Sequence, residues 1–336
     1  MLKLERIPLE ACDWEGMDAL SDRVLFQTRE WLEFLRATQR AEPVVAELKD
    51  GTESVGYFTG GVVRRYGVRI LGSPFPGWTT PYIGFNLFDG VSRRAAVEAL
   101  MPFAFGELGC MHLELRDRKL ARADLDGLGF EAASDPTFVL DLTPDEDTLL
   151  HQMTGSCRRN VVSATKRFGV TIEEADDLEF ADDYHAQLQD VFAKQSLVPT
   201  YGVERVRALI RNLHPTGRLL LLRARSPEGA CIATGIFPAF NGTAYFWGGA
   251  SWRAHQKLRP NEALMWTAMR YWKQRGAREI DLGGGADYKL KYGEIRTEDF
   301  LFFRRSRVRA LSKARNVAKR AFRLSLRARG RLRSSR

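Results

Sequence analysis

The stretch VVAELKDGTESVGYFTGGVVRRYGVRILGSP (residues 44–74) decides the expected fold, because the chain holds a close analogue of it far downstream. Its apolar runs and alternation are broken at residues 50–51 (Asp-Gly) and 66–67 (Tyr-Gly), which predicts a meander of three strands. The analogue is RLLLLRARSPEGACIATGIFPAFNGTAYFWGGAS (residues 218–251), which predicts a second meander of three strands.

The elements after each meander match as well. The tetrapeptide EALM occurs at 98–101 and again at 262–265, at an offset of 164 residues. Each copy opens a predicted helix that runs into a Gly and an apolar strand, GCMHLEL (109–115) and GAREIDL (276–282), at an offset of 167. Four matched elements in one order indicate an internal repeat of a strand-strand-strand-helix-strand unit.

The repeat predicts the domain limits. We expect a first unit over residues 1–143 and a second over 144–303, which would carry the active site. Between the two copies, residues 148–170 (TLLHQMTGSCRRNVVSATKRFGV) predict one helical stretch. Two further helices are predicted over 180–195 and 202–213.

Composition bounds the class of protein. The 336 residues are 44% hydrophobic and 28% charged, which is typical of a soluble globular chain. No apolar run approaches the roughly 18 residues that a membrane span requires. Residues 1–10 lack the basic and then apolar segments of an export signal, so a cytoplasmic location is expected. Four cysteines without CxxC spacing, and five histidines without HExxH or HxH, predict neither a disulfide framework nor a metal site.

The net charge of +9 is distributed unevenly. Residues 304–336 hold fourteen of the 51 basic residues and no acidic residue, which leaves residues 1–303 with 37 bases against 42 acids, a net charge of −5. Apolar residues recur every three or four positions over 306–328, a pattern that predicts a basic amphipathic helix. We therefore expect this tail to bind an anionic membrane surface at the inner face, or RNA phosphates such as those of tRNA.

Three motifs resemble a known family. They are the RRN-V-x5-K-x-x-GV stretch at 158–170, the helix after Pro260, and IDLGGGADYKLKYG at 280–293. With the doubled unit, they resemble the tandem GNAT-fold proteins of the FemAB and BioF2-like acyltransferase group. The resemblance implies an α+β fold of two tandem GNAT-like units with mixed sheets, here followed by the basic amphipathic helix.

The resemblance also implies an activity. Members of this group transfer an acyl or aminoacyl group to an amine, commonly on a cell-envelope precursor such as a glycan or a lipid-linked intermediate in the FemAB branch. The donor is acyl-CoA in most GNAT proteins and aminoacyl-tRNA in the FemAB branch, so no permanently bound cofactor is expected. Such a reaction needs a path for the amine proton, donors for the developing oxyanion and groups that hold the donor's phosphates.

The catalytic candidates follow the last repeat strand. Asp281 is positioned to accept the amine proton or orient a water, or else to pair with Arg278 or Lys289. The glycines at 283–285 either let backbone approach a ligand or form a flexible turn. Tyr288 and Lys289 follow at once, and a tyrosine after this strand often serves as general acid in GNAT enzymes, which the resemblance carries over to Tyr288.

Two basic clusters are candidates for binding the donor's phosphates. Arg253, Lys257 and Arg259 precede a helix that starts at Pro260, where the helix dipole favours an anion. This loop lacks the glycines of the usual GNAT phosphate loop, and its alternative reading is a solvated basic loop. The second cluster holds Arg158, Arg159 and Asn160 and is either a site for a phosphate of the donor or acceptor or the solvated face of a helix.

The aromatic segment SPFPGWTTPYIGFNLF (73–88) is too rich in turn residues for a strand interior and too apolar for an ordinary surface loop. We expect it to line an acceptor groove through Trp78 and Tyr82, joined by Lys291, or to pack beneath the domain interface.

The alternative is that the protein is not an enzyme but binds a membrane or RNA and retains the GNAT fold. The missing phosphate-loop glycines favour this alternative. Donor-dependent product formation separates it from an enzyme. The chain contains no GxxxxGK[ST], GxGxxG or GxSxG motif, which disfavours a nucleotide triphosphatase, a dinucleotide enzyme and a serine hydrolase.

Overall fold

The computed structural model describes residues 1–308, apart from 66, 76, 194–196 and 285. Its strands are β1 (Leu2–Ile7), β2 (Glu42–Asp50), β3 (Glu53–Arg65), β4 (Val68–Ser73), β5 (Gly84–Leu87), β6 (His112–Leu115), β7 (Glu131–Asp141), β8 (Thr171–Glu174), β9 (Leu219–Arg225), β10 (Cys231–Phe240), β11 (Thr243–Tyr245), β12 (Gly248–Ser251), β13 (Glu279–Asp281) and β14 (Ile295–Ser306). Its α-helices are α1 (Trp14–Asp18), α2 (Arg29–Gln39), α3 (Arg93–Pro102), α4 (Glu146–Gln152), α5 (Gly155–Lys166), α6 (Phe180–Ala193), α7 (Val203–Leu213) and α8 (Pro260–Gln274). The remaining short helical segments are η1 (Leu9–Ala11), η2 (Leu25–Gln27), η3 (Phe103–Glu107), η4 (Arg122–Leu125), η5 (His214–Thr216), η6 (Arg253–Leu258) and η7 (Asp287–Tyr292).

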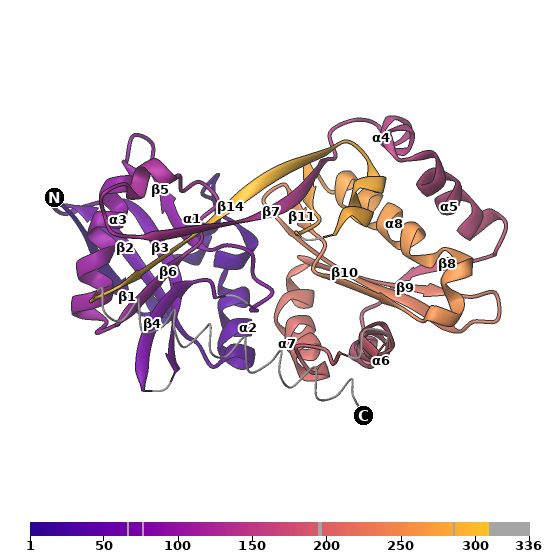
Figure 1. Ribbon diagram of the computed structural model, residues 1–336, viewed down its shortest axis with the longest axis horizontal. Coiled ribbons are helices and arrows are strands. Elements are labelled where there is room, and N and C mark those ends of the chain that lie inside the picture. The colour runs from indigo at the N-terminus through magenta and orange to yellow at the C-terminus, as the bar shows by residue number, and fades with distance from the viewer. Residues whose placement is uncertain (66, 76, 194–196, 285, 309–336) are drawn as a thin grey trace, which may run out of the picture.

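One mixed sheet runs through both halves of the described chain in the order β1-β2-β3-β4-β6-β14-β7-β13-β11-β10-β9-β8, with β5 beside β3 and β12 beside β10. Figure 1 shows it as two lobes, the N-terminal half in indigo and magenta and the C-terminal half in orange. Each half contains one parallel pair, β4 with β6 and β11 with β13, and the other ladders are antiparallel. The predicted α+β class with mixed sheets is confirmed.

The repeat predicted from sequence corresponds to real elements. The two EALM tetrapeptides lie in α3 and α8, and each helix leads into the second strand of its half's parallel pair. His112 of β6 is paired with Ile70 of β4, and Glu279 of β13, 167 residues after His112, is paired with Thr243 of β11. The carboxyl ends of β6 and β13 therefore occupy equivalent positions in the repeat.

The two halves exchange their last strands, and Figure 1 shows β7 and β14 crossing together from one lobe to the other. β7 ends beside β13 of the second half, where Asp141 pairs with Glu279. β14 returns to the first half and pairs with β6, with Phe303 opposite Leu115. The division at residue 144 stays a prediction, but β14, assigned to the second unit by that division, lies partly in the sheet of the first.

Three buried clusters hold the fold together, and two of them cover opposite faces of β9. Leu220 and Leu222 pack with α5 and α8, whereas Leu219 and Leu221 join a core formed by α2, α6 and α7. The alternation follows from the two-residue period of a strand, so four consecutive leucines serve two faces. The core beneath α2 and α7 spans both halves, because Trp31 of the first packs in the same cluster as Leu209 of the second. The third cluster lies beneath α3 and consists of residues of the first half together with Phe303 of β14.

Two predicted elements are interrupted in the structure. The single helical stretch expected over 148–170 is two helices, α4 and α5, because Thr154 leaves the helical path and its Oγ1 caps α5 by accepting from Cys157 N at 3.3 Å. The third strand of the second meander is divided into β11 and β12 at Phe246-Trp247. In the first half, the end of the aromatic segment forms the short strand β5.

The predicted tail helix lies outside the described residues beyond Val308, and β14 continues to Ser306, past the expected start of the tail at residue 304. In the part of the chain that the structure describes, no helix has both the length and the apolar character needed to cross a membrane.

Candidate functional site

The interruption between β11 and β12 opens the sheet. Phe246 N still donates to the Asp281 carbonyl at 2.8 Å, but Trp247 N turns to the Ile236 carbonyl at 3.1 Å, and β12 pairs only with β10. A cavity of about 320 Å³, here called the α8 cavity, fills the resulting gap. Its walls come from β10, β12, the start of α8 and η7 and include Phe246, Ser251, Met265, Tyr288, Lys291 and Tyr292.

Two glycines give this cavity its width. A Cβ at Gly249 would lie 2.9 Å from the ring of Phe246, and one at Gly235 would lie 2.5 Å from the ring of Phe237. Both distances are shorter than any real contact allows, so side chains here would displace the aromatic walls.

The α8 cavity faces the N-terminal end of α8. Arg259 adopts a left-handed conformation with φ of 60° and Pro260 takes the first helical position, and no side chain caps this end of the helix. The amides of Asn261 and Glu262 therefore lack intrahelical acceptors. The exposed Arg253, Lys257 and Arg259 lie on η6 and at this helix end, which is where the sequence predicted a phosphate site.

A buried carboxylate occupies the first turn of α8. Glu262 accepts from Lys291 Nζ at 2.8 Å and from Asn160 Nδ2 at 3.2 Å. Lys291 therefore lines the α8 cavity and does not join the aromatic segment as predicted, because Glu262 holds its ammonium there. Glu262 was not among the predicted site residues, although it stands in the repeated EALM tetrapeptide, whereas Asn160 belongs to the predicted basic cluster at 158–160 and here donates to Glu262.

The second basic cluster lies on α5. Arg158 donates to the His151 carbonyl at 3.3 Å, and Arg159 is exposed. Neither side chain lines the α8 cavity, so their predicted phosphate binding stays a prediction.

A second cavity of about 280 Å³, here called the Asp281 cavity, lies on the other side of Phe246, which lines both. The aromatic segment and the end of β13 form it together. Its walls include Phe26, Phe75, Trp78, Arg116, Trp247 and Asp281. The structure thus brings the predicted Trp78 and Asp281 together from opposite halves of the chain.

Asp281 is 5% exposed and holds two hydrogen bonds on one oxygen. Its Oδ1 accepts from Thr137 Oγ1 at 2.6 Å and from Gly283 N at 2.8 Å. Burial raises the pKa of Asp281, while the bonds from Thr137 and Gly283 and the charge of Arg118 oppose that rise. Such a carboxylate is a stronger base than an exposed aspartate, and its second oxygen has no hydrogen bond from the described residues.

Lys289 braces the turn that follows β13. Its Nζ donates to the Leu282 carbonyl at 2.6 Å and to the Gly284 carbonyl at 3.0 Å. Burial lowers the pKa of Lys289, and Asp281 partly restores it. Gly284 is required in this turn because a Cβ there would lie 2.3 Å from the Pro136 carbonyl oxygen. Lys289 lines neither cavity, so the contacts give it a positioning role beside Asp281.

Tyr288 lies in η7 with its ring half exposed at the α8 cavity. Partial desolvation raises the pKa of Tyr288 above its ordinary value, so the hydroxyl carries its proton at neutral pH. The structure therefore places the predicted proton donor on one side of Phe246 and the predicted base on the other.

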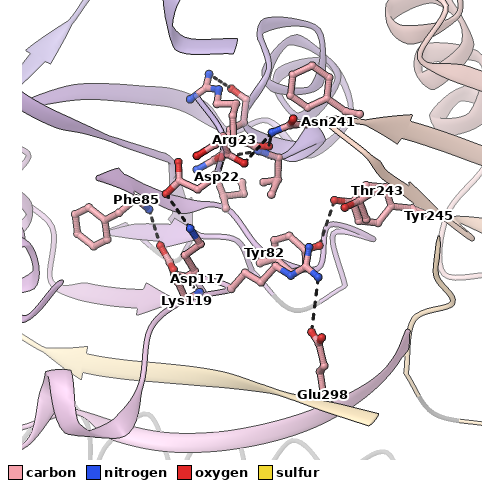
Figure 2. A pocket seen from close by; sticks show the side chains of 16 residues that line it. Asp22, Arg23, Tyr82, Phe85, Asp117, Lys119, Asn241, Thr243, Tyr245 and Glu298 are labelled. Atoms are coloured by element: carbon pink, nitrogen blue, oxygen red, sulfur yellow. Dashed lines mark hydrogen bonds and ion pairs between the residues drawn. The ribbon is translucent and has the colours of Figure 1, made fainter. Parts of the chain in front are cut away.

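The predicted Tyr82 lines a third cavity, of about 430 Å³, between the two halves (Figure 2). Its hydroxyl donates to that of Tyr245 at 3.2 Å, and Tyr245 lines both this cavity and the Asp281 cavity. Figure 2 shows Asp22, Asp117 and Lys119 on one side and Tyr245 on the other. Phe85 N donates to Asp117 at 2.7 Å, so Asp117 already has a role within the fold.

No group of three or more His, Cys, Asp and Glu side chains within the described residues is placed to hold a metal ion.

Part of the chain that contains this site matches a known protein family. Residues 152–292 match the model of a family described as an acetyltransferase (GNAT) domain, which contains the α8 cavity. No curated protein sequence matches the chain significantly.

Solved structures share the fold over nearly the whole chain. The structure of FemX has a TM-score of 0.71 at 15% identity, with 90% of this chain and 96% of that chain covered. L-PGS from Bacillus licheniformis gives 0.53 at 12% identity, covering 87% and 96%. A tandem GNAT protein from the clavulanic acid biosynthesis pathway gives 0.56 at 13% identity, covering 91% and 98%. These likenesses confirm the predicted tandem GNAT fold.

Proposed function

We propose that this chain, which has a tandem GNAT fold and matches a GNAT acetyltransferase domain, transfers an acyl or aminoacyl group from an activated donor in the α8 cavity to an amine in the Asp281 cavity. Phe246 carries this proposal, because it is the shared wall of two cavities with complementary chemistry. One cavity adjoins the uncapped start of a helix and a basic loop, and the other contains a buried carboxylate.

The reaction follows from these placements. The amine's lone pair attacks the acyl carbonyl carbon, a C–N bond forms, and the bond from that carbon to the donor's sulfur or oxygen breaks. The free oxygen of Asp281 takes the proton that the amine loses, and the raised pKa of Asp281 brings this base closer to working pH. The Tyr288 hydroxyl gives its proton to the leaving thiolate or alkoxide.

The proposal extends to the chemical class of the donor and of the acceptor. Both acyl-CoA and aminoacyl-tRNA carry phosphates, which suit the helix start and the bases at 253, 257 and 259. We propose an amine on a cell-envelope glycan or lipid-linked precursor as acceptor, supported by the FemAB resemblance. The basic residues that follow β14, which ends at Ser306, would hold the protein at the inner membrane face.

Donor-dependent transfer tests the function. The full chain is incubated with an amine mixture and either acyl-CoA or charged tRNA, and mass spectrometry detects the acylated product. Product formation with one donor class and not the other identifies the donor. No product with either, together with binding to vesicles or RNA, would favour the noncatalytic alternative.

Donor binding has a matched control. Replacing Arg253, Lys257 and Arg259 together by Ala should weaken donor affinity in calorimetry, with each lost phosphate contact costing about 1.5 to 3 kcal/mol. The control replaces the exposed Arg36 and Arg64, which lie in the first half away from the α8 cavity. Equal affinity in both variants would show that the loop is only solvated.

A further inference from the structure

The Asp281 cavity contains two hydrogen-bond donors that the fold leaves unused. Arg116 Nε and Trp247 Nε1 are both buried, and neither has a hydrogen-bond partner among the described residues. Buried donors are nearly always paired in native proteins, so each such group calls for an explanation. Both residues line one cavity, although one follows β6 and the other lies in the break after β11.

Arg116 is held in place while remaining available. Its guanidinium lies over the ring of Phe302 at 5.6 Å, and its Nη2 donates to Asp135. The Asp135 side chain is 74% exposed, whereas that of Arg116 is only 18% exposed. Water therefore screens Asp135, the acid that pairs with this cation among the described residues, and Arg116 lines the cavity.

Two hydroxyl groups of the cavity are already engaged. The Thr79 hydroxyl donates to the Trp78 carbonyl, and the Thr80 hydroxyl accepts from Trp31 Nε1 at 3.0 Å. The groups left for a ligand include one carboxylate oxygen, at Asp281, and the buried N–H donors of Arg116 and Trp247, of which the first is cationic. A guanidinium edge suits carboxylate or phosphate oxygens.

We propose that the acceptor is an amine that also carries an acidic group, a carboxylate or a phosphate, and that Arg116 and Trp247 bind this group while Asp281 receives the amine. The inference rests on the proposed function and names its substrate class. Arg116 and Asp281 carry opposite charges and line the same cavity, so they fix the orientation of the acceptor, because an anion beside Asp281 would be repelled.

The test compares amines that differ only in the acid. One arm uses β-alanine against β-alanine amide, and the other uses D-glucosamine 6-phosphate against D-glucosamine. The assay uses whichever donor class supports product formation in the transfer assay. In at least one arm, the wild type should have a higher kcat/KM for the amine that carries the acid than for its uncharged analogue. Which arm shows the preference separates a carboxylate from a phosphate.

Three variants test which residues cause the preference for the acid-bearing amine. Arg116→Gln should reduce it by about 10- to 100-fold, and Trp247→Phe, which keeps the ring and loses the N–H, by several-fold. Asp135→Asn should strengthen binding of the acid, because it removes a competitor for Arg116. Arg64→Gln, an exposed arginine on β3, is the control and should leave the preference unchanged. Arg116→Lys keeps the charge if the glutamine variant fails to fold.

Equal use of acid and amide in both arms would overturn the inference while leaving acyl transfer intact. An Arg116→Gln variant that loses the same fraction of its activity with the acid-bearing amine and with its uncharged analogue would also overturn the inference. If no donor supports turnover, calorimetry with the same four compounds decides the matter without catalysis. Binding of an acid that depends on Arg116 would then support the inference although the proposed function has failed, and no binding of any of the four would refute it.

Discussion

Replacing Asp281 by Asn separates the chemistry of this carboxylate from its part in the fold. Oδ1 of Asp281 accepts both of its hydrogen bonds, from Thr137 Oγ1 and Gly283 N. An Asn side chain offers an acceptor oxygen at the same place, so both bonds, each worth about 0.5 to 1.5 kcal/mol, can persist. The variant loses the base, and kcat should fall by ~100- to 10,000-fold.

The stability of Asp281→Asn has a predicted sign. Because burial raises the pKa of Asp281 above its unfolded value, ionising it costs folding free energy as the pH rises through and above the unfolded pKa. The Asn variant has no such cost, so at neutral pH it should be at least as stable as the wild type. The difference should shrink toward acid, where Asp281 is protonated in both states.

The assays are kcat against pH and urea unfolding at two pH values. The wild-type rate should fall on the acid side at a pH above the ordinary aspartate range, and the residual rate of the variant should lack that limb. Thr137→Val is the matched comparison, because it removes a bond that lowers the pKa of Asp281. It should move the acid limb to higher pH while retaining most of kcat. An Asp281→Asn variant with near wild-type kcat would refute the base assignment, and one that unfolds would show that the carboxylate is structural.

Three further perturbations test other groups. Tyr288→Phe should lower kcat by about ten- to a thousand-fold with donor affinity nearly unchanged, since it removes a proton and little contact area, and unchanged turnover would withdraw the general-acid role. Lys289→Met should destabilise the fold by about 2 kcal/mol or more in urea unfolding, because the carbonyls of Leu282 and Gly284 lose their donor, and a stable variant would contradict the bracing role. Truncation at residue 304 removes the end of β14 as well as the tail, so truncation after Ser306 is the cleaner test. It should release the protein from anionic vesicles and leave activity on a soluble acceptor intact, with retention on the vesicles as the opposing result.

Local periodicity was sufficient for most elements. The meanders and the helices before the repeat strands follow from spacing alone, and the offset between the two copies anticipated the shared position of β6 and β13. The break of helix 148–170 at Thr154 could not be read in this way, because it depends on one cap and on the distant Lys291 carbonyl, which accepts from Thr154 N at 3.0 Å. Strand exchange was equally hidden, since nothing in the pattern of β14 states which neighbour it pairs with.

Site residues that follow one strand in the sequence could be predicted. Site residues that the fold brings together from the two halves could not. Asp281 and Tyr288 stand close in sequence and were singled out together, whereas the position of Lys291 in the α8 cavity was not predicted, because its partner, Glu262, lies 29 residues away. Arg116 offered one unused signal, since the repeat offset of 167 places it opposite Gly283, and both line the Asp281 cavity. Trp247 offered none, because its unpaired N–H is a property of packing.

The exchange of β7 and β14 has a consequence for how the chain is made. β6 finishes at Leu115, but the strand that covers its free edge begins only at Ile295. At 5–20 residues per second, the ribosome needs about 10 to 40 seconds to synthesise the intervening stretch. During that interval the first lobe carries an open row of backbone donors and acceptors, the kind of edge at which nascent chains join one another. Among the described strands, the last to emerge is therefore the one that closes the sheet of the first lobe.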